Sequence, residues 1–103
     1  MKPADTSKDL LARAKDRGPF TRIGDLIRAL DGLSAREADG EQVDTLIDDS
    51  IIVSLRLRDS SLNAPEIVWH YLSDFDIRAN DPVFAKSQLG ALRSQLDKMA
   101  RFP

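Results

Sequence analysis

The chain has 103 residues, of which 42% are hydrophobic and 31% charged, a composition typical of one globular domain. It contains no cysteine, which excludes disulfides, thiolate metal sites and cysteine nucleophiles. Its net charge of −2 gives no reason to expect a nucleic acid or an anionic membrane as partner, and no stretch resembles a signal peptide or a membrane span. We therefore expect a cytoplasmic protein.

The charges are distributed unevenly along the chain. Residues 1–28 contain seven basic and four acidic side chains, whereas residues 37–49 contain six acidic side chains and no basic one. Runs of charge usually form solvated faces, and we expect this for both segments. The alternative is that the two segments pair with each other, within the fold or across a dimer.

The first helix is predicted over residues 6–17, where Gly18-Pro19 stops the chain from continuing as a helix. Its apolar content is small, so residues 1–18 are expected to pack loosely or to fray. A second helix is predicted over 22–31, because apolar residues recur there at helical spacing. Asp31-Gly32 is expected to end it.

Residues 34–40 are expected to form a short helical turn or a loop, because Asp39-Gly40 interrupts them. The next stretch, 41–59, has two interpretations. A helical stripe of apolar residues runs along its whole length, whereas residues 51–58 also alternate in the manner of a strand. We prefer a helix, because the chain offers no second strand for pairing.

A further helix is predicted to have Pro65 in its first turn and Asn63 as its cap, because proline is favoured in the first helical turn. The run 73–81 is rich in Ser, Asp and Asn, which favour turns, and is expected to form a loop. Asp81 and Pro82 are typical of a helix start, and residues 82–101 form an amphipathic pattern.

These elements predict an all-α single domain over residues 1–103, with four to five helices. The alternative is an α+β fold in which one strand near 51–58 pairs across a dimer. The predicted core consists of Ile23, Ile27, Leu30, Leu46, Ile47, Leu72, Phe75, Leu89, Leu92 and Leu96.

Candidate chemistry is sparse. The sequence contains no nucleophile motif, no phosphate loop and no dinucleotide fingerprint, so we expect neither a catalytic site nor a cofactor. His70 lies four residues before Asp74, which suggests a divalent-metal site as one alternative. It is the only histidine, however, so a structural or surface role is the preferred interpretation and no metal is expected.

The stretch 62–84 holds the only Trp and the only Tyr, residue types enriched at interaction hot spots. Its predicted partner-binding residues are Trp69, His70, Tyr71, Asp74, Asp76 and Arg78. Trp69 lies off the main apolar stripe of its helix, which leaves open whether it is core or surface. Arg78 is expected to hold the loop together by pairing with Asp74, Asp76 or Asp81.

The phrase HYLSDFDIR at residues 70–78, followed by DPVF at 81–84, resembles a stretch of small uncharacterised bacterial proteins. The resemblance implies that this loop carries either the role or the fold of that family. It assigns no function and no site residue.

The preferred function is a small non-catalytic protein–protein interaction or accessory protein, with self-association as a homodimer. The second hypothesis is a DNA-associated regulator that uses the basic N-terminal segment. The third is the divalent-metal site at His70 and Asp74.

Overall fold

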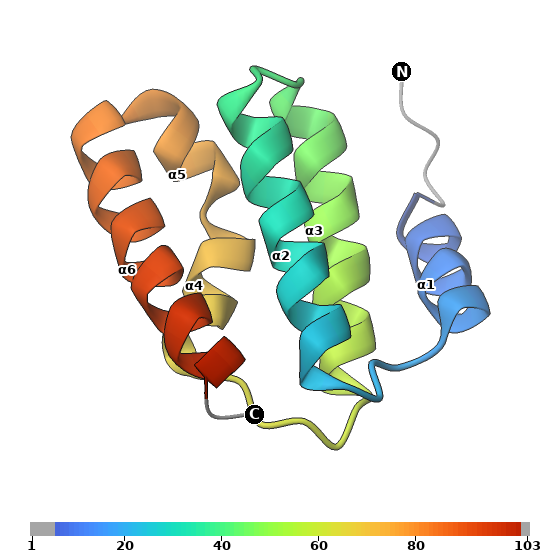
Figure 1. Ribbon diagram of the computed structural model, residues 1–103. Coiled ribbons are helices and arrows are strands. Elements are labelled where there is room, and N and C mark those ends of the chain that lie inside the picture. The colour runs from blue at the N-terminus through green and yellow to red at the C-terminus, as the bar shows by residue number, and fades with distance from the viewer. Residues whose placement is uncertain (1–5, 102–103) are drawn as a thin grey trace.

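A computed structural model describes residues 6–101 and shows an all-α domain, which confirms the predicted fold class (Figure 1). The helices are α1 (Thr6–Arg17), α2 (Ile23–Ala38), α3 (Val43–Arg58), α4 (Glu66–Ser73), α5 (Phe75–Asn80) and α6 (Pro82–Arg101). There is no strand among these residues, so the alternative of a strand near 51–58 is wrong. The segment is helical because a helix buries residues at helical spacing on one face of α3, among them Leu46, Val53 and Leu57.

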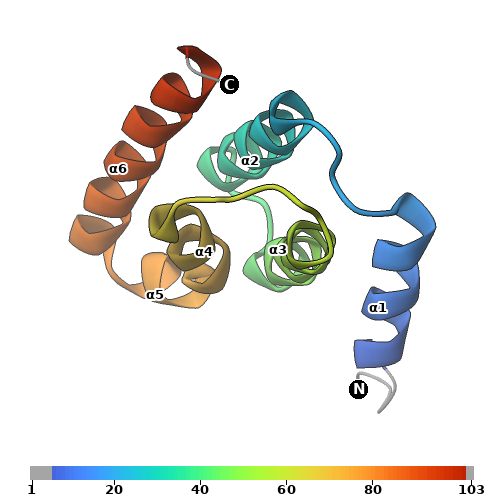
Figure 2. The same ribbon diagram turned by 90° about the horizontal axis from the view of Figure 1, so that it is seen from below.

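The helices are arranged around the antiparallel pair of α2 and α3. Viewed from below, α3 is seen nearly end-on, with α1 on one side of it and the α4–α6 unit on the other (Figure 2). α3 contacts α1, α2, α4 and α5, whereas α6 closes the domain against α2, α4 and α5. α3 therefore connects α1 and α2 to the α4–α6 unit.

The second helix is longer than the sequence predicts, because Asp31-Gly32 does not end it. Leu26, Leu30 and Leu33 are all buried on one face, so burial of Leu33 carries the helix past the glycine. The helix ends at Ala38 instead, and Gly40, two residues later, adopts a φ of +81° and donates its backbone N–H to the carbonyl oxygen of Glu37 at 3.1 Å. Glycine tolerates this left-handed conformation without steric cost.

The predicted loop over 73–81 is also corrected, because residues 75–80 form the short helix α5. Phe75 and Arg78, three residues apart, are both buried, and this anchoring outweighs the turn preference of the surrounding polar residues. The start of α6 agrees with the sequence. Asp81 Oδ1 accepts the backbone N–H of Phe84 at 3.0 Å, which is the bond of an N-terminal cap.

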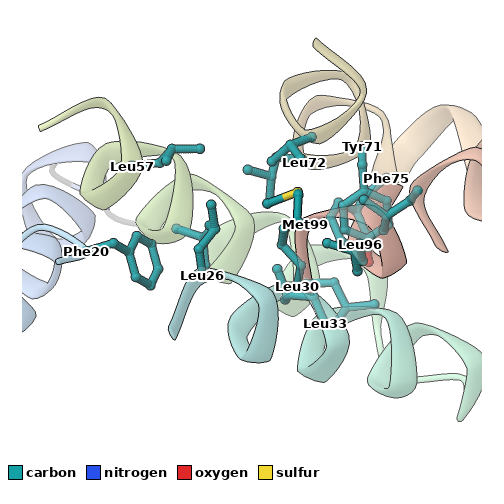
Figure 3. Packing of buried hydrophobic residues seen from close by; sticks show 14 residues of the cluster. Phe20, Leu26, Leu30, Leu33, Leu57, Tyr71, Leu72, Phe75, Leu96 and Met99 are labelled. Carbon is teal, nitrogen blue, oxygen red and sulfur yellow. The ribbon is translucent and has the colours of Figure 1, made fainter. Parts of the chain in front are cut away.

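The main hydrophobic core lies between the α2–α3 pair and the α4–α6 unit (Figure 3). Six predicted core residues are buried in it, namely Leu30, Leu46, Leu72, Phe75, Leu92 and Leu96, whereas Ile23, Ile27, Ile47 and Leu89 are half-buried at its edge. A second, smaller cluster of Leu10, Ala14 and Ile52, with Leu55 beside it, holds α1 on α3. Residues 1–5 of the segment predicted to be loose lie outside the described residues.

Within residues 6–101, no helix combines the length and the apolar character that crossing a lipid bilayer requires.

We expect Leu30→Ala to lower the free energy of unfolding by about 2–5 kcal/mol, because it removes methyl groups from a fully buried site. Urea denaturation measures the change. Val83→Ala is the control, since Val83 is 81% exposed and its truncation should change the free energy by less than about 0.5 kcal/mol. Equal losses for the two variants would contradict this description of the core.

Candidate functional site

The six residues predicted to bind a partner do not share one surface. Tyr71 and Arg78 are 0% and 3% exposed, so they lie in the interior and cannot contact a partner directly. Trp69 and Asp74 are half-buried, and Trp69 packs against the edge of the main core, which answers the question left open by its position in the sequence. The remaining two, His70 and Asp76, are exposed.

Arg78 lies at the centre of a buried polar cluster. Its Nε and Nη2 donate to the two carboxylate oxygens of Glu37 at 2.9 and 3.0 Å, and its Nη1 donates to the Tyr71 carbonyl oxygen at 2.8 Å and to Gln88 Oε1. The guanidinium also lies over the rings of Tyr71 and Phe75, at 4.2 and 4.3 Å from their centroids. The expected pairing with Asp74, Asp76 or Asp81 is therefore wrong. Because α5 is helical, it directs Arg78 into the core toward α2.

Asp74 joins this cluster indirectly, because Gln88 Nε2 donates to Asp74 Oδ2 at 2.7 Å. The Tyr71 hydroxyl has no hydrogen-bond partner of standard geometry among residues 6–101. Burial raises the pKa of Tyr71, and the negative charge of Glu37 raises it further. The cluster thus fastens α2, α4, α5 and α6 together and is enclosed by them, which makes it a structural element.

His70 and Asp74 line a shallow groove between α4 and α6, together with Ile67, Phe84 and Ser87. Nowhere in residues 6–101 do three His, Asp or Glu side chains come together as a metal site requires. One of the two candidate donors, Asp74, already accepts the Gln88 amide. The metal hypothesis therefore has two donors and lacks a third in this part of the chain.

A more distinctive site lies between α1, α2 and α3, where a hollow of about 270 Å³ is surrounded by arginines. We call it the arginine groove. Its lining consists of Arg13 and Arg17 from α1; Arg28, Ala29, Gly32, Leu33 and Arg36 from α2; and Asp49, Ile52, Val53 and Arg56 from α3. Five cationic side chains thus surround an apolar floor.

The two ends of the groove differ in charge. At the end near the α2–α3 turn, Asp49 accepts a hydrogen bond from Arg36 at 2.6 Å and lies 3.6 Å from Arg13. Glu41 also accepts from Arg36 Nε at 2.8 Å, and these carboxylates raise the pKa of Arg36. Arg13 belongs to the basic segment 1–28 and Asp49 to the acidic segment 37–49. Their pairing agrees with the alternative that the two segments contact each other within the fold.

The opposite end lies where α1 and α3 finish and α2 begins, and it carries Arg17, Arg28 and Arg56. Only Arg28 has a carboxylate partner among residues 6–101, because its Nη2 lies 2.6 Å from the exposed Asp25. Arg56 Nε donates to the carbonyl oxygen of Gly18 at 2.8 Å, and its guanidinium lies 4.0 Å from the centroid of the Phe20 ring.

Burial lowers the pKa of Arg56, and the positive charge of Arg17 lowers it further. The negative charge of Asp25, the carboxylate that pairs with Arg28, acts in the opposite direction and raises the pKa of Arg56, so it offsets only part of the repulsion between the two cations. We call this part of the site the cationic end of the groove. An anion bound there would relieve the repulsion between like charges.

Sequence reasoning missed the arginine groove because its residues come from three separate segments. A local signal was present, since Arg13 and Arg17 are four residues apart, as are Arg28, Gly32 and Arg36. This spacing places each set on one helix face. It does not show that the faces meet, which depends on the packing of α1 against α3.

Arg78→Ala should lower the free energy of unfolding by about 3–5 kcal/mol, because it leaves the partly buried Glu37 carboxylate without its cation and removes the donor to the Tyr71 carbonyl oxygen and to Gln88 Oε1. Chemical denaturation measures the loss. Arg93→Ala is the matched control, since Arg93 pairs with Asp31 at the surface and such pairs contribute about 0–1 kcal/mol. A loss of under 1 kcal/mol for Arg78→Ala would contradict a structural role for the buried pair.

Tyr71 should resist ionisation in the folded protein, and it is the only tyrosine, so phenolate absorbance reports on it alone. Its pKa is raised above the unfolded value of about 10. The contribution of neutral Tyr71 to the free energy of unfolding is therefore complete below pH ~10. It is lost as the pH rises further, since the tyrosine of the unfolded chain releases its proton at a lower pH than that of the folded protein. We expect phenolate absorbance to rise together with alkaline unfolding monitored by circular dichroism. A phenolate transition in protein that remains folded near pH 10 would overturn this.

Comparison with protein-family models, curated proteins and solved structures finds no match for the chain. Of the two hollows described, the arginine groove is the better candidate for a binding site, because five arginines line it and some of them have no carboxylate partner among residues 6–101.

Proposed function

We propose that this is a small non-catalytic interaction protein that binds an acidic segment of a partner protein in the arginine groove. The observation that carries the proposal is the cationic end, where Arg17, Arg28 and Arg56 have one exposed carboxylate among them. Arginine suits this role, because its planar guanidinium forms paired hydrogen bonds with carboxylates.

The shape of the groove favours a protein segment over a nucleic acid. The lining contains no aromatic side chain on which a base could stack, and the Phe20 ring is buried beneath Arg56. On α2 the lining extends from Arg28 to Arg36, about 12 Å at 1.5 Å per residue. A DNA duplex is too wide to enter such a hollow between helices.

The DNA hypothesis relied on the basic N-terminal segment, and two of its cations, Arg13 and Arg17, line the groove. Asp49 partly neutralises Arg13, which weakens the segment as an independent contact for phosphates. Nucleic-acid binding therefore becomes an outcome that the experiment below can detect.

The two exposed residues of the 62–84 stretch line different hollows, His70 with residues of α6 and Asp76 with residues of α3, so the proposal does not include them in one contact surface. A cytoplasmic location and self-association as a homodimer are further parts of the proposal. Sedimentation velocity tests the homodimer, and a single monomeric species at high micromolar concentration would contradict it.

Reversing charge in the groove should weaken binding of a fluorescein-labelled poly-glutamate peptide, monitored by anisotropy at low salt. We expect the double variant Arg17→Glu/Arg28→Glu to bind at least about tenfold more weakly than the natural protein, which corresponds to about 1.4 kcal/mol. Both side chains are exposed, so the fold should tolerate the change.

The control is Lys86→Glu/Lys98→Glu, which makes the same change in net charge at exposed positions of α6, outside the groove. Equal weakening in both double variants would show general charge attraction and overturn the groove as the site. Absence of peptide binding to the natural protein at low salt would overturn the proposal. A labelled single-stranded oligonucleotide that binds more tightly than the peptide would establish the nucleic-acid alternative instead.

A further inference from the structure

We infer that the segment bound in the arginine groove is an amphipathic helix, with an apolar stripe on the groove floor and carboxylates at the cationic end. This inference rests on the proposed function and names the kind of partner.

The floor of the groove is apolar. Leu33 of α2 and Ile52 and Val53 of α3 lie along it, with Ala29 beside them. An extended segment placed here would bring unpaired backbone N–H and C=O groups against hydrocarbon, which is costly. A helix pairs these groups internally and presents only side chains, which is how amphipathic helices occupy hydrophobic grooves.

The α2 wall leaves room for another helix. Gly32 lies midway between Arg28 and Arg36 and is exposed, and a Cβ placed on it would meet no atom within 4 Å. With Ala29 one turn earlier, the middle of this wall is low and its two ends are cationic. Helices that pack on each other lie about 8–10 Å apart, and small side chains at the contact favour the lower part of this range.

The length of the site fits roughly two helical turns. The α3 residues that line it, Asp49, Ile52, Val53 and Arg56, follow the spacing of one helix face. A partner would therefore place three or four apolar residues at spacings of three and four over the floor.

The charges also fix where its acidic residues lie. Asp49 and Glu41 neutralise the end near Arg36, whereas the cationic end is largely free of carboxylates. Acidic side chains of the partner should therefore cluster at one end of its helix, over Arg17, Arg28 and Arg56. A carboxylate facing Asp49 would be repelled, so the same charges spread evenly along the helix would bind less tightly.

The test compares two labelled peptides of about 15 residues, a length at which an isolated helix is marginal in water. The first has leucines at helical spacing and glutamates at one end. The second has the same composition in an order that places the leucines on no single face. We expect the first to bind about tenfold more tightly by anisotropy and to gain helical circular dichroism on mixing.

Gly32→Gln provides a variant that fills the groove without changing its charge. It should weaken binding of the amphipathic peptide about tenfold and leave binding of the reordered peptide nearly unchanged. Gly90→Gln is the matched control, because Gly90 is also an exposed helical glycine with nothing within 4 Å, and it lies on α6 outside the groove. Both variants should fold, since replacing a helical glycine favours the helix.

The outcomes separate this inference from the proposed function. Equal binding of the two peptides, both weakened by Arg17→Glu/Arg28→Glu, would overturn the helical partner and leave an anion-binding groove. Failure of both peptides to bind at low salt would overturn both proposals. Displacement of the peptide by millimolar inorganic phosphate at matched ionic strength would identify a small-anion site and also overturn the helical partner.

Discussion

The buried guanidinium of Arg78 is the constraint on which the arrangement of the helices depends. A charged group of this size is stable in the interior only when each of its donors has an acceptor and a counter-ion is near. Here the counter-ion comes from α2, a carbonyl oxygen from α4 and an amide oxygen from α6, while α5 supplies the arginine itself. Sliding any one of these helices would leave a polar group unpaired, so the cluster sets their relative positions.

The end of α2 that contributes to this cluster also borders the arginine groove. Glu37 and Arg36 are neighbours near the end of α2, and they point to different networks: Glu37 binds Arg78 in the interior, whereas Arg36 binds Glu41 and Asp49 beside the groove. The position of α2 that satisfies the buried cation also sets the α2 wall of the groove. Within one turn of α2, Glu37 thus stabilises the fold, whereas Arg36 lines the proposed binding site.

The sequence allowed most of the fold to be predicted. Helical periodicity located α3, α6 and the first part of α2, and Gly18-Pro19 correctly marked the end of α1. Where local rules failed, burial was the reason: Leu33 extended α2 past Gly32, and Phe75 with Arg78 turned an expected loop into α5. A core arginine was not expected, because arginine is rarely buried without a partner and its partner lies 41 residues away.

The site was harder to predict than the fold. Aromatic content drew attention to residues 62–84, where Tyr71 and Arg78 are interior residues. The arginine groove instead combines i and i+4 pairs from separate helices, each of which is ordinary for a solvated helix face when considered alone. Its concave shape depends on tertiary packing, which composition and periodicity do not encode directly.

The attachment of α1 has a consequence for how binding strength can be adjusted. This helix rests mainly on α3 through a small cluster of Leu10, Ala14 and Ile52, and the chain reaches it through Gly18, whose φ is +77°. Local unfolding of such a peripheral element costs less than opening the main core. Because α1 contributes one wall, the groove is complete only in molecules in which α1 is docked. The apparent affinity of the groove for a ligand is therefore proportional to the fraction of molecules in which α1 is docked. A change in the stability of α1 would thus change the binding strength without altering the rest of the domain.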